Sequence, residues 1–108
     1  MPIDLTKENC DAEVKESAMP VVVDFWGPAC GPCMAFMPKF LDIAGKYDGK
    51  VKFCKVDTSQ NKRVAINFKV MSLPTILFWK GGAEVARISG ADVTDESVKA
   101  KIEEMIKL

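Results

Sequence analysis

The stretch PVVVDFWGPACGPC, residues 20–33, decides the fold class. Its first half, residues 20–26, is an almost continuous run of apolar and β-branched side chains, which is typical of a strand buried on both faces of a mostly parallel sheet. The segment CGPC, residues 30–33, follows a few positions later, where open α/β sheets place their reactive groups. We therefore expect residues 20–26 to form the central strand and the two cysteines to begin the next helix.

The rest of the chain alternates between strand and helix patterns around that stretch. The expected strands are 3–5, 20–26, 51–57, 76–79 and 84–88, with Gly81 and Gly82 as a tight hairpin between the last two. The expected helices are 11–18, with Cys10, Val14 and Ala18 on one face; 33–47; one capped by Thr58 or Ser59 that runs to about Phe68; and one capped by Thr94. This order predicts a three-layer α/β/α sandwich with a mixed sheet of about five strands and four helices. No repeat or linker interrupts the pattern, so we expect one domain, residues 1–108.

Composition restricts the chemistry available to the protein. The 108 residues include 15 basic and 15 acidic side chains, four cysteines and no histidine. A net charge of zero argues against a nucleic-acid partner, because no long-range field would collect phosphates. Without histidine there is no imidazole base, no Cys-His pair and no imidazole metal ligand. Any catalysis must therefore use cysteine, carboxylate or lysine.

The start of the chain has neither the basic nor the apolar segment of a signal peptide, and no apolar run is long enough to span a membrane. We therefore expect a cytoplasmic protein with no membrane association. In that reducing compartment cysteines are normally free thiols, metal ligands or transient redox partners.

The spacing of Cys30 and Cys33 suits a reversible disulfide. Residues three apart on a helix have Cβ atoms about 5 to 6 Å apart, and a disulfide needs Cα atoms about 4.4 to 6.8 Å apart. The unpaired N–H groups at the helix start stabilise the Cys30 thiolate more than its thiol. Pro32 is tolerated in the first turn, where its missing N–H costs nothing. We interpret Cys30 as the nucleophile and Cys33 as the resolving thiol.

Asp24 interrupts the apolar strand just before the two cysteines. Burial would raise the pKa of this carboxyl group toward neutrality. Our hypothesis is that Asp24, through a water, accepts the proton of Cys33, with Lys55 on the next strand as its charge partner. As alternatives to these roles, Asp24 could be a buried ion-pair carboxylate with a purely structural role, and Lys55 could be an ordinary surface lysine.

With these residues the chain resembles the thioredoxin family nearly end to end. The resemblance covers the CGPC segment, Asp24-Phe25-Trp26, Pro38, Lys55, Leu73-Pro74-Thr75 and Gly90. It implies a cis peptide before Pro74, beside the cysteines, and a shallow apolar surface where the backbone of Leu73 pairs with an extended substrate. The residues implied for substrate binding are Trp26, Gly31, Pro32, Leu73, Pro74 and Gly90, although Trp26 could instead support the loop by packing.

The resemblance also implies an activity. It is the reduction of protein disulfides by a monomer that binds no cofactor or metal and receives electrons from NADPH through a flavin-dependent thioredoxin reductase. Two positions depart from the family pattern. Ala29 stands where the family usually has a tryptophan, which predicts altered recognition of reductase and clients, and Lys69 stands where a glycine is common.

Several alternatives compete with the reductase. A zinc site could combine the motif with Cys10 and Cys54, but structural zinc sites favour a second close ligand pair and the chain has none. Cys10, on a helix face, and Cys54, within a strand, are better interpreted as small buried hydrophobes. A related oxidase or isomerase would show a more oxidising equilibrium with glutathione. A pure binding module would keep its function after Cys30→Ser.

Overall fold

The central sheet has five strands in the order β1-β3-β2-β4-β5. The structure is a computed structural model that describes all of residues 1–108. The strands are β1 (Ile3–Asp4), β2 (Val21–Trp26), β3 (Lys52–Asp57), β4 (Thr75–Lys80) and β5 (Ala83–Ser89). β1, β2 and β3 are parallel, whereas β4 and β5 are antiparallel to their neighbours. The mixed five-stranded sheet expected from the sequence is confirmed.

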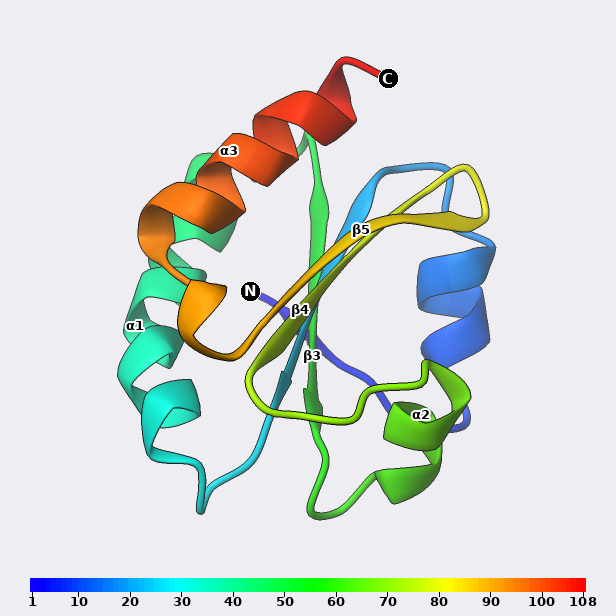
Figure 1. The fold of residues 1–108 in the computed structure, drawn as a ribbon. Coiled ribbons are helices and arrows are strands. Elements are labelled where there is room, and N and C mark those ends of the chain that lie inside the picture. Colours follow the sequence, from blue (N-terminus) through cyan, green and yellow to red (C-terminus); the bar gives the residue numbers. More distant parts are fainter.

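Helices cover both faces of this sheet, as Figure 1 shows. They are η1 (Asp11–Lys15), α1 (Gly31–Lys46), α2 (Lys62–Asn67) and α3 (Asp95–Ile106), with a short 3-10 turn η2 (Gly90–Asp92) before the last. α1 and α3 lie on one face; α2, drawn in green, and η1, drawn in blue, lie on the other. The expected α/β/α sandwich is therefore confirmed.

The central strand supplies both halves of the hydrophobic core. Residues 21–25 of β2 are all buried, with β3 and β4 paired along its two edges. Val22 belongs to the cluster under α1 and α3, whereas Val21 and Val23 belong to the cluster under η1 and α2. This alternation follows from the two-residue period of a strand, and it explains why the run in the sequence is apolar on both faces.

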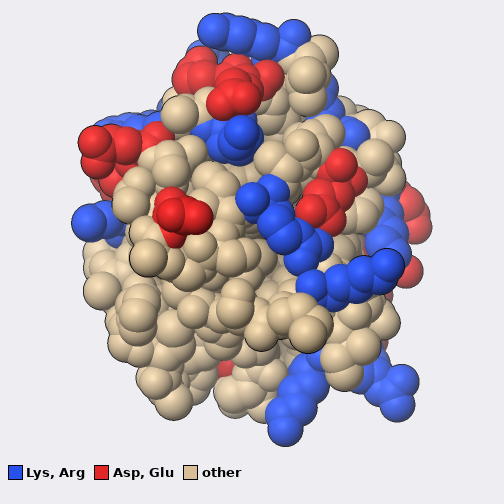
Figure 2. Space-filling view, viewed as in Figure 1, with Lys and Arg blue, Asp and Glu red and all other residues tan.

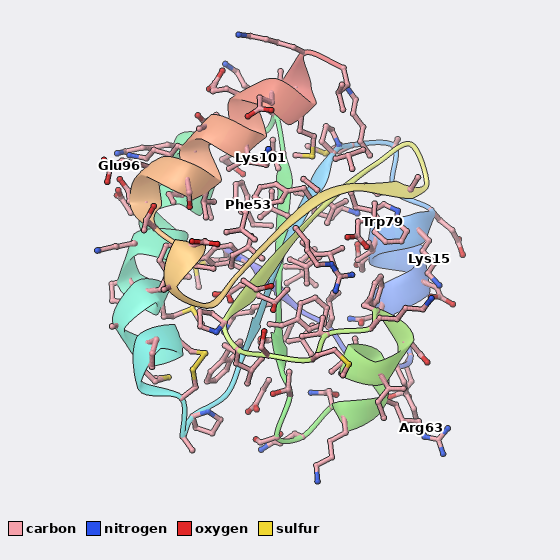
Figure 3. All side chains as sticks on the ribbon, in the orientation of Figure 1. Lys15, Phe53, Arg63, Trp79, Glu96 and Lys101 are labelled. Carbon is pink, nitrogen blue, oxygen red and sulfur yellow. A yellow bond between two sulfur atoms is a disulfide. The ribbon has the colours of Figure 1, made fainter.

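The η1 face of the sheet is closed partly by aromatic side chains. The ring of Phe68 meets Trp79 of β4 edge to face, with 5.5 Å between centroids, and Lys15 Nζ lies 5.5 Å from the centroid of the Phe68 ring. Figure 3 shows Lys15 and Trp79 on this side of the sheet. Trp79 therefore helps to close this face by packing against Phe68.

Two expected helix boundaries were wrong because side chains bind the backbone locally. η1 has π-helical hydrogen bonding and ends at Lys15, and Ala18 is exposed and does not lie on a buried face. The Ser17 hydroxyl group both accepts from the N–H and donates to the carbonyl of Met19, which forms a turn in place of another helical turn.

The third expected helix starts later than its sequence suggested. Neither Thr58 nor Ser59 caps it, because Thr58 Oγ1 donates to the carbonyl oxygen of Trp26 and Ser59 Oγ donates to Asp57. α2 instead follows Asn61. By contrast, Thr94 caps α3 as expected, with its hydroxyl oxygen accepting from Ser97 N–H at 3.0 Å.

Candidate active site

Cys30 and Cys33 are joined by a disulfide at the start of α1. Their Cα atoms are 5.2 Å apart, inside the range that a disulfide accepts. Cys30 occupies the N-cap position and is partly exposed, whereas Cys33 in the first turn is 1% exposed. A substrate can therefore reach the sulfur of Cys30 but not that of Cys33.

The N-terminal end of α1 favours negative charge on the Cys30 sulfur. The backbone N–H of Cys33 donates to Cys30 Sγ at 3.2 Å, and the first turn of α1 contains no acidic side chain. The helix dipole adds partial positive charge at the same end. These features stabilise a thiolate at Cys30 more than a thiol.

Asp24 lies in β2, and its carboxyl group has no hydrogen-bond partner. The residue is 1% exposed, and both carboxyl oxygens are buried. Burial raises the pKa of Asp24 to about 7, and the positive charge of Lys55 opposes that rise. This buried carboxyl group can consequently gain or lose a proton near neutral pH.

Lys55 pairs with a residue that the sequence did not single out. It stands opposite Asp24 in the register of β2 and β3, but its Nζ lies 3.3 Å from Asp4 Oδ1 and 5.8 Å from the centroid of the Trp26 ring. Lys55 thus forms its ion pair with Asp4. Its positive charge acts on Asp24 only by longer-range electrostatic attraction. Only the parallel pairing of β1 with β3 brings Asp4 opposite Lys55, so no local pattern could have identified it.

The peptide bond between Leu73 and Pro74 is cis, as the resemblance implied. Pro74 is buried, and its carbonyl oxygen accepts from the N–H of Gly90 at 2.9 Å. Thr75, the next residue, pairs with Phe25 of β2, so this loop lies at the same end of the sheet as the motif. The backbone N–H and carbonyl of Leu73 have no partner in the chain.

Gly31 and Pro32 are exposed, and Leu73 and Gly90 are partly exposed. Figure 2 shows that the surface over the start of α1 is almost free of charged side chains, which lie over α3, β5, η1 and α2 instead. Trp26 lies apart from this surface, in a hollow that it shares with Lys55 and Asp57. Trp26 therefore contacts Lys55, the lysine opposite Asp24, on a different part of the surface from Gly31 and Pro32.

A second hollow, about 450 Å³ in volume, lies directly beside Cys30. We call it the Cys30 hollow; its lining residues are Gly27, Pro28, Ala29, Cys30, Thr58, Ser59, Lys62 and Leu73. Thr58, Ser59 and Lys62 were not predicted as site residues; the loop after β3 and the start of α2 bring them to the motif from about thirty positions along the chain. Leu73 Cδ1 would lie 3.5 Å from a Cβ at Gly27, so the loops meet closely there.

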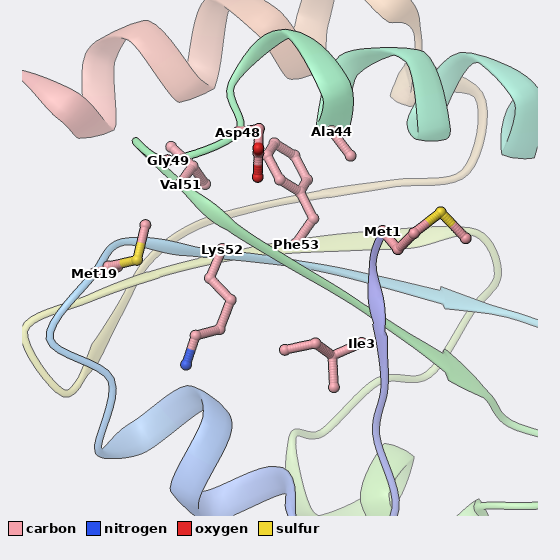
Figure 4. A pocket seen from close by; sticks show the side chains of 9 residues that line it. All are labelled: Met1, Ile3, Met19, Ala44, Asp48, Gly49, Val51, Lys52 and Phe53. Carbon is pink, nitrogen blue, oxygen red and sulfur yellow. The ribbon is translucent and has the colours of Figure 1, made fainter.

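Other parts of the molecule show no comparable chemistry. A hollow of about 270 Å³ lies at the opposite end of α1 (Figure 4), lined by Met1, Ile3, Met19, Ala44, Asp48, Gly49, Val51, Lys52 and Phe53. It contains no cysteine and none of the predicted site residues.

Cys10 and Cys54 are free and buried in the core under η1 and α2. Burial raises the pKa of both thiols, that of Cys54 to about 12. The structure brings together no group of three or more His, Cys, Asp or Glu side chains that could hold a metal ion. None of its helices has the length and apolar character needed to cross a membrane.

Comparison with known proteins agrees with this geometry. The family model described as "Thioredoxin" matches residues 1–104. The chain is 41% identical over 100 residues to the thioredoxin of Peptoclostridium acidaminophilum, covering 93% of this chain and 91% of that protein. It is 42% identical over 87 residues to thioredoxin 1 of Nostoc sp. PCC 7120, covering 81% of each chain. The protein therefore belongs to the thioredoxin family and is a thiol-disulfide oxidoreductase of the protein-disulfide reductase type.

Proposed function

We propose that the protein reduces disulfides of client proteins through Cys30 as nucleophile and Cys33 as resolving thiol. The observation that carries this proposal is the difference between the two sulfurs: Cys30 is partly exposed at a helix N-terminus, and Cys33 is buried one turn deeper. A nucleophile must reach the client, whereas a resolving thiol only needs to reach Cys30.

The reaction has two exchange steps. The Cys30 thiolate attacks one client sulfur, the client disulfide breaks, and one client thiolate leaves. Cys33, once deprotonated, then attacks Cys30 Sγ, the mixed disulfide breaks, and the second client thiolate leaves. The client gains two electrons, and the protein is left with the Cys30–Cys33 disulfide.

Asp24 is the proposed acceptor of the Cys33 proton, through a water. Three properties of the Asp24 carboxyl group support this role: it is buried, it has no hydrogen-bond partner in the chain, and burial raises its pKa to about 7. A base with this pKa is matched to proton transfer at neutral pH. Lys55 is a positioning residue in this proposal: it limits the rise in the Asp24 pKa while Asp4 holds its ammonium group.

Client binding is assigned to the uncharged surface around the motif. The free backbone N–H and carbonyl of Leu73 can pair with an extended client segment, as in strand addition. Gly31, Pro32 and Gly90 would border that segment, with Pro74 shaping the loop beneath it. Trp26 supports the site from the side of Lys55.

The proposed electron source is NADPH, delivered by a flavin-dependent thioredoxin reductase, with no cofactor bound to this chain. We propose one domain over residues 1–108, working as a monomer in a reducing compartment such as the cytoplasm. Ala29 is expected to change which reductase is accepted, because a large apolar contact is absent beside Cys30.

Insulin reduction tests this proposal. With dithiothreitol as electron source the protein should accelerate insulin precipitation, and Cys30→Ser should abolish the acceleration. With NADPH and candidate reductases from the same organism, at least one should support turnover. Absence of insulin reduction by the fully reduced protein would refute the assignment of protein disulfides as substrates. Reduction driven by dithiothreitol but by no NADPH-dependent enzyme would refute the proposed electron source alone.

A further inference from the structure

Lys62 places a free positive charge at the rim of the Cys30 hollow. It is the first residue of α2, its side chain is exposed, and it forms neither an ion pair nor a hydrogen bond. The ammonium group of Lys62 is therefore available to a ligand that enters the hollow.

The hydroxyl groups of the other polar side chains in the hollow already donate hydrogen bonds within the chain. Thr58 Oγ1 donates to the carbonyl oxygen of Trp26 at 3.0 Å, and Ser59 Oγ donates to Asp57 Oδ1 at 2.6 Å. Among the eight lining residues Lys62 is the only charged one, and its N–H groups are the only side-chain nitrogen donors. A polar group that enters the hollow thus meets a single strong donor, and that donor is a cation.

No acidic side chain lines the Cys30 hollow. Asp57 lies outside it, and Asp57 Oδ1 accepts both the N–H and the hydroxyl of Ser59. Glu8 lines a separate hollow together with Lys62 but forms no ion pair with it. The single charge among the lining residues therefore favours a carboxylate over an ammonium group.

The position of the hollow links it to the attacked disulfide. Cys30 lines it on one side and Leu73, whose backbone is free, lines it on another. A client segment that lies along Leu73 with its cysteine at Cys30 Sγ passes the opening. The small side chain of Ala29 leaves this space unfilled, and about 450 Å³ is enough for one acidic side chain.

We propose that the Cys30 hollow receives an Asp or Glu side chain of the client, next to the cysteine that Cys30 attacks, and that Lys62 binds its carboxylate. The inference rests on the proposed function and adds a substrate preference to it. Lys62 is then a specificity-determining residue and takes no part in the thiol exchange itself.

Two disulfide-linked peptides that differ only in Glu or Gln beside the cysteine test this preference. The second-order rate constant for their reduction by the fully reduced protein is measured at low and high salt. At low salt the Glu peptide should react about two- to five-fold faster, the range expected for one exposed ion pair, and the preference should shrink at high salt. The Gln peptide reports the reductase activity that does not depend on Lys62. Failure to reduce either peptide would therefore count against the proposed function and not against the substrate preference alone.

Four variants assign the preference to the hollow. Lys62→Gln should abolish it, Lys62→Arg should retain it, and Ala29→Trp should abolish it by filling the space while Lys62 remains. Lys50→Gln is the matched control, because Lys50 is exposed and unpaired in the turn after α1, at the other end of that helix. Equal rates for the two peptides with the wild type, or a preference that survives Lys62→Gln, would overturn the proposal. So would a loss in Lys62→Gln that is equal for both peptides.

Discussion

Arg87 holds the carbonyl oxygen of Lys69, the only residue other than glycine that has a left-handed backbone conformation. Arg87 Nη1 donates to Lys69 O at 2.9 Å, and Lys69 has φ of 57°. Nη2 also donates to the carbonyl of Phe68 at 2.8 Å, and Glu84 binds the other edge of the guanidinium group. The arginine therefore fixes the end of α2, from which the chain runs to Leu73 and Pro74.

Arg87→Met should lower the free energy of unfolding by about 1 to 3 kcal/mol, because charge-assisted hydrogen bonds to two carbonyl groups are lost. The loss should be smaller when Lys69 is changed to glycine, which adopts the left-handed conformation without help. Urea denaturation of the two single variants and the double variant measures this coupling. Arg63→Met is the control, since Arg63 is exposed and has no partner. Strict additivity would contradict a role for Arg87 in holding Lys69.

Asp24 should make the oxidised protein less stable as pH rises. Its folded pKa of about 7 lies above the usual value of an aspartic acid, so the folded state binds the proton more tightly than the unfolded state between about pH 4 and 7. The free energy of unfolding must therefore fall across this window, by about 4 kcal/mol if Asp24 acts alone. Asp24→Asn should remove that fall, so the difference in free energy of unfolding between the variant and the wild type should change with pH across this window. A constant difference would mean that Asp24 does not titrate in this range.

The same residue should control how fast the mixed disulfide is resolved. If Asp24 accepts the Cys33 proton, the rate of resolution should rise with pH through about 7, and Asp24→Asn should slow it about ten-fold or more near neutral pH. Rapid mixing of the reduced protein with a chromogenic disulfide separates this step from the first attack. An unchanged rate and pH profile in Asp24→Asn would show that another group takes the proton.

Cys10 and Cys54 should not react with alkylating reagents while the protein is folded. They are 2% and 0% exposed, and burial raises the pKa of both thiols. Iodoacetamide at about pH 8 should label Cys30 of the reduced protein, and the two core cysteines should be labelled only after denaturant is added. Peptide mapping by mass spectrometry identifies the sites. Rapid labelling of Cys54 in the folded protein would contradict its place in the core.

The sequence predicted the parts of the site that lie on continuous patterns. The apolar run before the motif placed Asp24 in the central strand, and the spacing of Cys30 and Cys33 placed the disulfide in the first turn of α1. The cis bond before Pro74 followed only from family resemblance, because no local pattern of the chain requires it.

The features that the sequence did not predict depend on contacts between distant segments. Asp4 reaches Lys55 only through the pairing of β1 with β3, and Lys62 reaches the Cys30 hollow only because two loops end at the same edge of the sheet. The start of α2 was misplaced for a related reason: the Thr58 side chain binds Trp26 of another strand instead of capping a helix. Short-range propensity contains no information about such partners.

Trapping the mixed disulfide tests the central claim, that Cys30 attacks and Cys33 resolves. Reduced Cys33→Ser is incubated with a disulfide-containing protein, quenched with acid and analysed by intact-protein and peptide mass spectrometry. The account predicts a stable one-to-one adduct joined through Cys30, and no adduct with Cys30→Ser. Absence of an adduct with Cys33→Ser, or an adduct of Cys30→Ser joined through Cys33, would contradict it.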